Sequence, residues 1–463
     1  MDLVSALKKA GFRHVTGEKK IIDELSRDKS PIVGSTPLAI VWPSGTAQIS
    51  KLMRLCDSGK IGVTVRGAGS ALTGSSVPIG KSIILDMRHL GSILEINIHD
   101  KYVVVEPGVI LGDLNRKLAK YGYFYPPDPG SSGFATIGGT ISTNAGGLRA
   151  VRYGTTKDWL LGLEVVLPNG KVIKTGGRVL KRSIGYDLTG LFVASEGTLG
   201  VITKAILKIC PMPEKVALVV GYYKRISDAG KVIAELNGKG VELLAAEFLD
   251  REAMGIMAGG KRLKLPDNAE YMLFVEIGTS AESLSRISAE VQHAFRKYGA
   301  SGIEVAASKE KIERLYAARK NIFTVMKKSA DIAKKSLMIA DSVVPISELP
   351  DSLVEMEKVR KRHSLQVVLF GHIGDGNIHA NIVYDKSEAG EVAEMDEIQE
   401  EFARIAIKHG GSVSGEHGIG IAKKALLKEE FAARGTLESL VLMKKIKSVF
   451  DPNGILNRGK IFD

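Results

Sequence analysis

Short apolar runs rich in β-branched residues alternate with amphipathic stretches between residues 36 and 209. A run of this kind that is bounded by turn residues predicts a strand, whereas apolar positions at helical spacing, as in 46–59, predict a helix. The run 160–176 predicts a β-hairpin with Asn169-Gly170 as its two-residue turn. The predicted strands are 38–42, 61–65, 83–87 and 102–108.

A second α+β pattern begins after residues 210–214, where two prolines interrupt the alternation and mark a domain boundary. It contains predicted strands at 216–223 and 271–278 and a long amphipathic helix at 308–330. We therefore expect three parts. They are an N-terminal domain at 1–209 (a helical lead-in and two α+β subdomains), a second domain at 210–409, and a mainly helical C-terminal segment at 410–463.

Composition is typical of a soluble globular protein. The 463 residues are 44% hydrophobic and 25% charged, and no stretch approaches the ~18 uncharged apolar residues of a membrane span. The N-terminus lacks the pattern of a secretory signal, so we expect a cytoplasmic protein. Cys56 and Cys210 lie far apart in sequence and cannot supply the four thiolates of an iron–sulfur cluster.

The net charge of +12 leaves three kinds of partner open: an anionic substrate or cofactor, an anionic lipid surface, and an acidic protein. Nucleic acid is not expected, because the basic residues are spread along the chain, aromatic residues make up only 6%, and no nucleic-acid-binding module is recognised. Peripheral contact with the inner face of a membrane is compatible with this charge.

The stretch 65-VRGAGSALTGSS-76 has part of the glycine fingerprint of nicotinamide-binding domains, but its spacing differs. That fingerprint needs a third glycine where Leu72 stands, followed by a helix. Only residues 75–82 separate Gly74 from the next predicted strand, and a crossover with its own helix needs about 10–12 residues or more. The sequence therefore predicts a long loop between strands, which either binds an anion through successive N–H groups or forms a surface turn.

Two further segments, 125–159 and 185–204, are also rich in glycine, serine and threonine. Such backbone freedom is costly unless something must approach the main chain closely. A flat ring or a pyrophosphate is a ligand of that kind. Three such loops in one region indicate a nucleotide-type cofactor.

Two histidines and an acidic residue indicate a metal site. His372 and His379 flank a glycine-rich loop, and in a hairpin they would face each other as a cross-strand pair about 5 Å apart, a separation that a divalent metal bridges. In 411-GSVSGEHGIG-420, Glu416 and His417 are neighbours on an extended chain and would point to opposite sides, one toward the metal. The alternative for the two histidines is a pair of polar residues at the end of a hairpin, and the alternative for residues 411–420 is an ordinary acidic turn.

Five motifs together carry a family resemblance: RGAGSALTG, PPDPGSSGFATIGGTISTNAGG, YDLTGLFVASEGTLGVIT, GHIGDGNIHANI and GSVSGEHGIG. In this order they resemble the FAD-linked D-2-hydroxyacid dehydrogenases, of the D-lactate dehydrogenase and glycolate oxidase catalytic subunit type, within the vanillyl-alcohol-oxidase superfamily. The resemblance covers roughly residues 35–461. It implies an α+β fold with a two-part FAD-binding domain at 1–209, an antiparallel-sheet substrate cap at 210–409, and a C-terminal segment returning to the flavin.

The resemblance also implies which residues hold FAD. Members with a covalently tethered flavin carry a histidine where Ser70 stands, so the FAD is expected to be non-covalent. The residues carried over are Arg66, Gly67, Ala68, Gly69, Ser70 and Gly74 in the first loop, Pro127, Asp128, Gly138, Gly139, Ser142, Asn144, Gly147, Tyr153 and Gly154 in the second, and Glu196, Gly197, Gly200, Val201 and Ile202 in the third.

For catalysis, the resemblance assigns His372, His379 and Glu416 as metal ligands, with Zn²⁺ the usual proposal. Two imidazoles and a carboxylate suit Mn²⁺, Co²⁺ or Fe²⁺ as well, so the identity of the metal stays open. His417 corresponds to the base beside flavin N5, and Asn381 to a substrate contact. Arg319 corresponds to the arginine that clasps the substrate carboxylate; the alternative for it is a solvent-facing position on a basic helix.

The implied reaction is oxidation of a small D-2-hydroxy acid, D-lactate or glycolate, to the 2-oxo acid. It combines metal-assisted deprotonation with hydride transfer to FAD N5. Electrons then pass to a quinone, a cytochrome, another flavoprotein or an iron–sulfur subunit, and a homodimer is compatible with this scheme. Two alternatives stay open: an FAD transferase resembling alkylglycerone-phosphate synthase, and a non-catalytic flavin-binding subunit of a larger oxidase complex.

Overall fold

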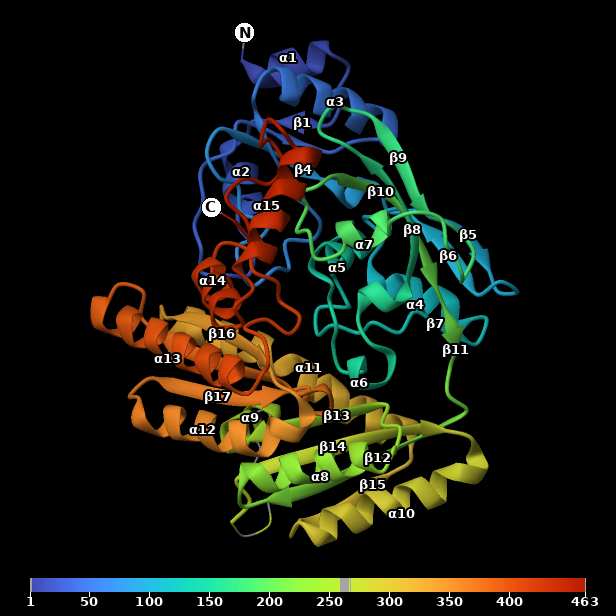
Figure 1. The fold of residues 1–463 in the computed structure, drawn as a ribbon, viewed down its shortest axis with the longest axis vertical. Coiled ribbons are helices and arrows are strands. Elements are labelled where there is room, and N and C mark those ends of the chain that lie inside the picture. The colour runs from blue at the N-terminus through green and yellow to red at the C-terminus, as the bar shows by residue number, and fades with distance from the viewer. Residues whose placement is uncertain (1, 259–265, 267, 463) are drawn as a thin grey trace. The chain divides into compact units, whose positions relative to one another are not determined.

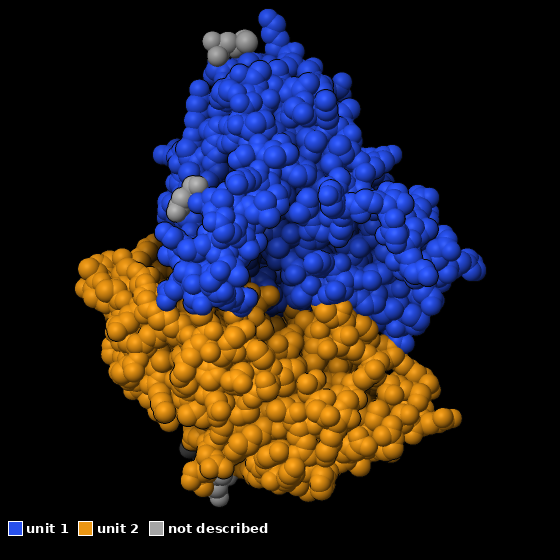
Figure 2. Space-filling view, in the orientation of Figure 1, with its two compact units in different colours: residues 1–146, 155–212, 416–463 blue, residues 147–154, 213–415 orange. Residues whose placement is uncertain are grey.

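The computed structural model describes residues 2–258, 266 and 268–462. The chain divides into two compact units, shown in different colours in Figure 2. Unit 1 comprises Met1–Gly146, Thr155–Met212 and Glu416–Asp463, and unit 2 comprises Gly147–Gly154 and Pro213–Gly415. Among the described residues, no helix is long and apolar enough to cross a membrane.

The first sheet of unit 1 has the order β1-β2-β4-β3, in which β2, β4 and β3 are parallel and β1 is antiparallel. Figure 1 labels β1 and β4 of this sheet. Helix α3 (Thr46–Ser58) buries Ile49, Leu52, Met53 and Cys56 in the same core cluster as the strand residues of this sheet. This i, i+3, i+4, i+7 spacing is the apolar stripe of an amphipathic helix. The other elements are α1 (Leu3–Lys9), β1 (Val15–Thr16), α2 (Lys19–Leu25), β2 (Ile40–Val41), β3 (Gly62–Arg66), β4 (Ser82–Asp86) and η1 (Met87–His89).

Strands β3 and β4 are parallel neighbours, and residues 67–81 join them without any helix. The sequence predicted this loop from its length. In a dinucleotide-binding fold a helix would fill the same crossover and point its N-terminus at the pyrophosphate. No such helix is present between β3 and β4 in this chain, where the structure describes every residue.

The second sheet of unit 1 is antiparallel, with the order β5-β6-β10-β8-β9. The predicted 160–176 hairpin is present, but its turn was predicted wrongly. Gly170 N–H donates to Leu167 O (2.8 Å) and Leu167 N–H donates to Lys171 O (2.9 Å), so the loop has three residues and Gly170 takes φ +79°. Proline at 168 suits the first central position of such a turn.

The remaining elements of unit 1 are the strands of this sheet, further elements of the N-terminal part of the chain, and the helices of the C-terminal segment. They are β5 (Ile93–Asn97), β6 (Tyr102–Val105), α4 (Leu111–Ala119), β7 (Tyr123–Phe124), α5 (Ile137–Thr143), η2 (Thr156–Trp159), β8 (Leu160–Val166), β9 (Val172–Gly176), α7 (Leu188–Phe192), β10 (Val201–Lys208), β11 (Cys210–Pro211), α14 (Lys424–Ala433) and α15 (Leu437–Phe450).

Unit 2 is built on one antiparallel sheet of seven strands, in the order β15-β12-β14-β13-β17-β18-β16. Helices cover both faces: α8, α10, α12 and α13 contribute to one core cluster, and α9 and α11 to the other. Along β14, Leu273, Val275 and Ile277 join the first cluster, while Met272 and Phe274 join the second. Both faces are therefore buried, which explains why these strands read as continuous apolar runs.

The strands of unit 2 are β12 (Lys215–Tyr223), β13 (Ala245–Asp250), β14 (Tyr271–Thr279), β15 (Ser301–Ala306), β16 (Ser336–Val343), β17 (Gln366–Gly371) and β18 (Asn377–Tyr384). Its helices are α6 (Ala150–Tyr153), α8 (Ile226–Gly238), α9 (Arg251–Met257), α10 (Ala281–Lys297), α11 (Lys309–Ile332), η3 (Ile346–Glu348), α12 (Leu349–Arg362), η4 (Ile373–Asp375) and α13 (Ala389–Lys408).

Candidate active site

The first glycine loop of unit 1 is closed to side chains at two positions. A Cβ on Gly67 would lie 2.2 Å from Thr136 Oγ1, and one on Gly69, whose φ is +65°, would lie 2.1 Å from Arg66 Nη2. The Arg66 side chain is buried; it donates from Nη1 to Gly67 O (3.1 Å) and lies 3.8 Å from Asp86 Oδ2. The loop is therefore held by its own arginine and by the start of α5.

Three buried polar atoms around this loop have no hydrogen-bond partner: Arg66 Nε, Ser76 Oγ and Asn457 Oδ1. Asn457 reaches the loop through its amide, which donates to Ser75 O (2.8 Å) and to Glu196 O. Buried polar atoms without partners are rare in folded proteins and indicate a missing ligand or water. The two donors, Arg66 Nε and Ser76 Oγ, and the close main chain fit a pyrophosphate-bearing cofactor such as FAD.

The sequence did not single out Asn457 as a site residue. It lies in the final segment 451-DPNGILNRGKIFD-463, where Leu456 forms an isolated bridge with Val63 of β3. A turn-rich ending was visible in the sequence, but its packing beside β3 was not, because 382 residues separate Asn457 from Ser75.

The second glycine segment contains α5 and its caps. Thr136 caps the helix by accepting from Gly139 N (3.3 Å), and a Cβ on Gly138 would lie 2.7 Å from Pro107 Cβ. Asn144 ends the helix at φ +54°, and its side chain accepts from Lys157 N (2.9 Å), so that side chain holds a turn. The other predicted FAD residues in unit 1 are Ala68, Ser70, Gly74, Pro127, Asp128, Ser142, Gly197, Gly200, Val201 and Ile202.

Three predicted FAD residues lie in unit 2 instead: Gly147, Tyr153 and Gly154. They belong to the short segment 147–154, which includes α6. Arg149 of this segment pairs with buried Glu276 of β14 (3.3 Å), and Arg152 donates to Gly278 O (2.8 Å). The structure thus groups these three with the seven-stranded sheet and not with the glycine loops.

Glu196 has a structural contact that its sequence motif did not predict. It takes φ +49°, is buried, and its carboxylate accepts from Ile419 N (2.7 Å) and Gly420 N (2.9 Å). Burial raises the pKa of Glu196 to about 7, although those two hydrogen bonds oppose the shift. Glu196 therefore fastens the chain just after His417.

His372 and His379 come together in unit 2, but not in the predicted register. His372 follows β17 directly and His379 lies in β18, opposite Phe370. The facing cross-strand pair was therefore a wrong prediction: the short helix η4 begins at Ile373, so His372 stands at the start of the turn and not in the ladder. The two rings still meet edge to face, with centroids 5.1 Å apart.

Each imidazole is backed by a buried carboxylate. His372 Nδ1 bonds to Glu247 Oε1, and His379 Nδ1 lies 3.4 Å from Asp341 Oδ1. Glu247 is 0% exposed and Asp341 is 1% exposed. Metal-binding histidines commonly donate their second ring N–H to a carboxylate, which fixes the tautomer, and His372 makes that hydrogen bond, whereas His379 Nδ1 makes none with Asp341. The donor set therefore fits a divalent metal.

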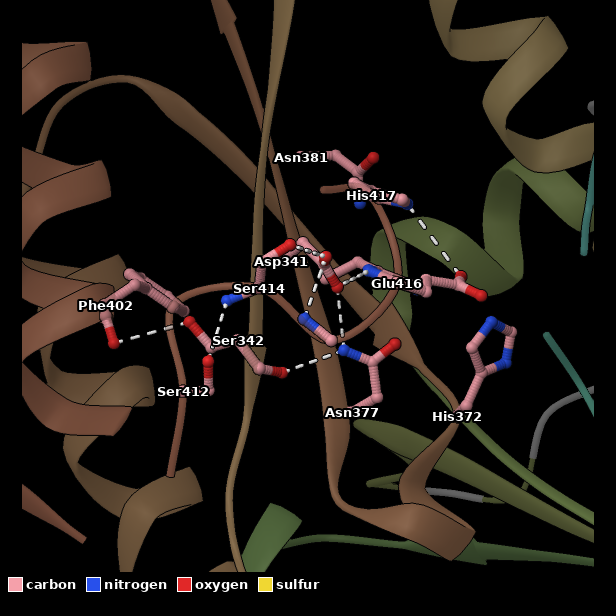
Figure 3. A network of polar contacts seen from close by, with 12 residues as sticks. Asp341, Ser342, His372, Asn377, Asn381, Phe402, Ser412, Ser414, Glu416 and His417 are labelled. Atoms are coloured by element: carbon pink, nitrogen blue, oxygen red, sulfur yellow. Dashed lines mark hydrogen bonds and ion pairs between the residues drawn. The ribbon is translucent and has the colours of Figure 1, made fainter. Parts of the chain in front are cut away.

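Asp341 also anchors the segment that leads to Glu416 (Figure 3). Its Oδ2 accepts from Gly415 N (3.0 Å) and Ser414 Oγ (3.2 Å), and its Oδ1 accepts from Asn377 Nδ2 (2.8 Å). Glu416 is the next residue after Gly415. His372, His379 and Asp341 belong to unit 2, whereas Glu416 and His417 begin the last segment of unit 1.

Glu416 and His417 do not point to opposite sides as predicted. His417 Nε2 lies 3.8 Å from Glu416 Oε1, as the dashed line in Figure 3 marks. The chain bends at residues 415–417 and is not extended there, so the alternation of a strand does not apply. The His417 carbonyl accepts from Thr73 Oγ1 (3.3 Å), which ties it to the first glycine loop within unit 1.

Arg319 is buried and not solvent-facing, so the basic-helix alternative is excluded. It lies in α11, with Nη2 2.6 Å from Glu247 Oε2 and its guanidinium carbon 4.4 Å from the centre of the Phe370 ring. Neither its Nε nor its Nη2 has a hydrogen-bond partner, so its contact with Glu247 is an ion pair and not a hydrogen bond. A guanidinium has five donors, so the contact with Glu247 leaves donors for a carboxylate ligand.

Asn381 is completely buried in β18. Its Nδ2 donates to Val368 O (3.2 Å) in β17, and its Oδ1 has no hydrogen-bond partner. The side chain therefore braces the hairpin that carries both histidines. Its Oδ1 is the atom with capacity for a ligand or a water.

Sequence reasoning missed Glu247 and Asp341. Each is an acidic residue inside an apolar run, in 243-LLAAEFLD-250 and 337-LMIADSVV-344. A charge in a buried strand is costly unless it is paired. That cost is a signal that the sequence offered and that could have marked both residues as site candidates.

Two family models match the chain. The model described as "FAD linked oxidases, C-terminal domain" matches residues 212–461, and the model described as "FAD binding domain" matches residues 37–176. A protein of Bacillus subtilis (strain 168) named glycolate oxidase subunit GlcD is 34% identical, covering 94% of this chain and 91% of that one. A D-lactate dehydrogenase of Anaerostipes hadrus is 32% identical, covering 99% and 97%.

Solved structures are similar in fold. A 4-ethylphenol oxidase from Gulosibacter chungangensis superposes with a TM-score of 0.81 at 18% identity, covering 99% of this chain and 96% of that one. An alkyldihydroxyacetonephosphate synthase superposes with a TM-score of 0.75 at 18% identity, covering 98% and 84%. At this identity the likeness shows the fold alone, and the expected fold of the vanillyl-alcohol-oxidase type is confirmed.

Proposed function

The chain belongs to the FAD-linked oxidases, and on that premise we propose that it oxidises a small D-2-hydroxy acid to the 2-oxo acid. D-Lactate and glycolate are the substrates that the names of its relatives favour. Electrons leave the reduced flavin for a separate acceptor: a quinone, a cytochrome, another flavoprotein or an iron–sulfur subunit.

The observation that carries the proposal is the contact of a single carboxylate with two predicted site residues. Glu247 touches both His372 and Arg319, which come from β17–β18 and from α11. A candidate metal ligand and a candidate carboxylate-binding group thus lie one side chain apart. A 2-hydroxy acid presents a matching pair, a hydroxyl and a carboxylate on adjacent carbons.

Each part of the reaction has a residue suited to it. Arg319 binds and orients the substrate carboxylate through its fork of N–H donors. His417 accepts the proton of the substrate hydroxyl as a general base. Asn381 contributes its buried Oδ1 as an acceptor beside His379.

FAD, when held by the glycine loops of unit 1, supplies the acceptor for the C2 hydrogen and its electron pair. A divalent cation such as Zn²⁺, when held by His372, His379 and Glu416, supplies positive charge beside the substrate hydroxyl and so lowers its pKa. His417 would take the hydroxyl proton, and FAD held by the glycine loops would supply the two-electron acceptor that the conversion of a 2-hydroxy acid to a 2-oxo acid needs.

Anaerobic mixing of the flavin-loaded protein with D-lactate, L-lactate, glycolate and D-2-hydroxyglutarate tests the proposal. We expect flavin absorbance to bleach with D-lactate or glycolate and to stay unchanged with L-lactate. The His417→Ala variant should keep its flavin but bleach at least about 10²-fold more slowly, because it lacks the base. A colourless protein would contradict the proposal and both alternatives, whereas a yellow protein that no hydroxy acid bleaches would contradict the proposal and favour an FAD transferase or a non-catalytic flavin-binding subunit.

A further inference from the structure

Glu247 is the most deeply buried acidic residue beside the candidate ligands. It lies in β13 with 0% exposure, between apolar neighbours of a sheet that is covered on both faces. A carboxylate taken out of water is costly unless partners compensate it. Its position therefore needs an explanation beyond strand formation.

The two oxygens of Glu247 have different partners from different elements. Oε1 bonds to His372 Nδ1 at the end of β17, and Oε2 lies 2.6 Å from Arg319 Nη2 in α11. The other side of the Arg319 guanidinium is set by the Phe370 ring at 4.4 Å, and Phe370 pairs with His379 in the β-ladder. One carboxylate thus joins the helix that carries the arginine to the hairpin that carries both histidines.

We propose that Glu247 is a positioning residue that sets the metal-binding tautomer of His372 and the orientation of Arg319 at the same time. This inference rests on the proposed function. Because Oε1 holds the proton of Nδ1, the lone pair of His372 is presented at Nε2. Because Oε2 restrains one end of the guanidinium, the remaining donors of Arg319 keep a fixed direction relative to that nitrogen.

The chain offers a matched control in Glu276. It lies on the neighbouring strand β14 with 1% exposure and is also paired with an arginine, Arg149 at 3.3 Å. Glu276 contacts neither His372 nor Arg319 among the bonds that the structure gives it. A Glu→Gln change at either position removes one buried charge from the same sheet, but only Glu247→Gln alters the histidine and Arg319.

The test uses flavin-loaded, metal-depleted protein titrated with Co²⁺, read from the visible absorption of the bound metal. We expect Glu247→Gln to bind Co²⁺ about 10- to 100-fold more weakly than wild type and with an altered spectrum. Glu276→Gln should match wild type. With Co²⁺ saturating, Glu247→Gln should still lower kcat for D-lactate without raising KM, since Arg319 keeps its charge and loses its orientation.

Glu247→Asp provides a second measurement that does not depend on tolerance of the Gln variant. It keeps the charge but is one methylene too short to reach both partners, so Co²⁺ binding should again weaken. Wild-type affinity in both Glu247 variants would overturn the inference while leaving the proposed function intact. Failure of the wild-type protein to bind Co²⁺ would instead overturn the metal assignment, and this inference with it.

Discussion

At the residue scale, the buried carboxyl group of Glu196 makes the stability of the folded protein depend on pH. Its carboxylate holds two backbone N–H groups of the segment that follows His417, yet burial raises its pKa to about 7 from the ordinary 4.5. Between these two values the folded protein keeps a proton that the unfolded chain releases. The contribution of Glu196 to stability is therefore full below pH 4.5 and falls as pH rises through about 7.

The substitution Glu196→Gln should remove this pH dependence. Glutamine keeps an oxygen that accepts hydrogen bonds but carries no charge, so the variant should gain stability relative to wild type between pH 5 and pH 8. The gain should reach at most about 3 kcal/mol, as expected for a shift of this size. Urea unfolding followed at both pH values measures it; an identical difference in unfolding free energy at both would show that Glu196 does not titrate in this window.

Individual residues also show why some site residues could be predicted from the sequence and others could not. Arg319, His372, His379, Glu416 and His417 were named because their motifs resemble those of a family. Glu247 and Asp341 were not, because their partners lie far away in sequence: Glu247 and His372 are 125 residues apart.

At the scale of elements, the glycine loop between β3 and β4 shows that space for a side chain is missing at particular positions of a loop. Gly67 has no room for a side chain, since its Cβ would lie 2.2 Å from Thr136 Oγ1. Thr136 cannot turn away freely, because the same oxygen caps α5. Gly133, in the next glycine-rich segment, has nothing within 4 Å of a Cβ.

Gly67→Ala should therefore lower flavin content and cost about 1–3 kcal/mol of stability through overpacking. Gly133→Ala, the matched control, should leave both near wild type. Flavin per protein, from the absorbance of the purified variants, and their melting temperatures decide the question. Full flavin occupancy in Gly67→Ala would mean that the loop can shift to accommodate the methyl group, and that the close approach of Gly67 to Thr136 is not required for cofactor binding.

At the scale of the whole molecule, the two units have separate cores, and tryptophan fluorescence reports on the unfolding of one of them. The chain has two tryptophans, Trp42 and Trp159, and both lie in unit 1 against its core clusters. Compact units with their own cores commonly unfold as separate cooperative steps. Tryptophan fluorescence therefore follows unit 1, whereas far-ultraviolet circular dichroism follows both.

Removal of the flavin should shift the fluorescence transition to lower denaturant concentration, because the loops proposed to bind FAD lie in unit 1 and ligand binding stabilises the state that binds it. The part of the circular dichroism transition that belongs to unit 2 should move less. Parallel denaturant titrations of flavin-loaded and flavin-free protein compare the two signals. Superimposable transitions with equal shifts would show that the chain unfolds as one unit.

The sequence by itself determined what depends on neighbours along the chain. Spacing was enough to exclude a helix between Gly74 and the next strand, apolar runs indicated the strands, two prolines marked the domain boundary, and the motifs identified the family. Only the tertiary structure decided the register of His372 against His379, the bend that brings Glu416 to His417, and the contacts of Glu247, Asp341 and Asn457. Those features depend on which distant strands pair and on where a buried charge finds its partner, and no local pattern encodes either.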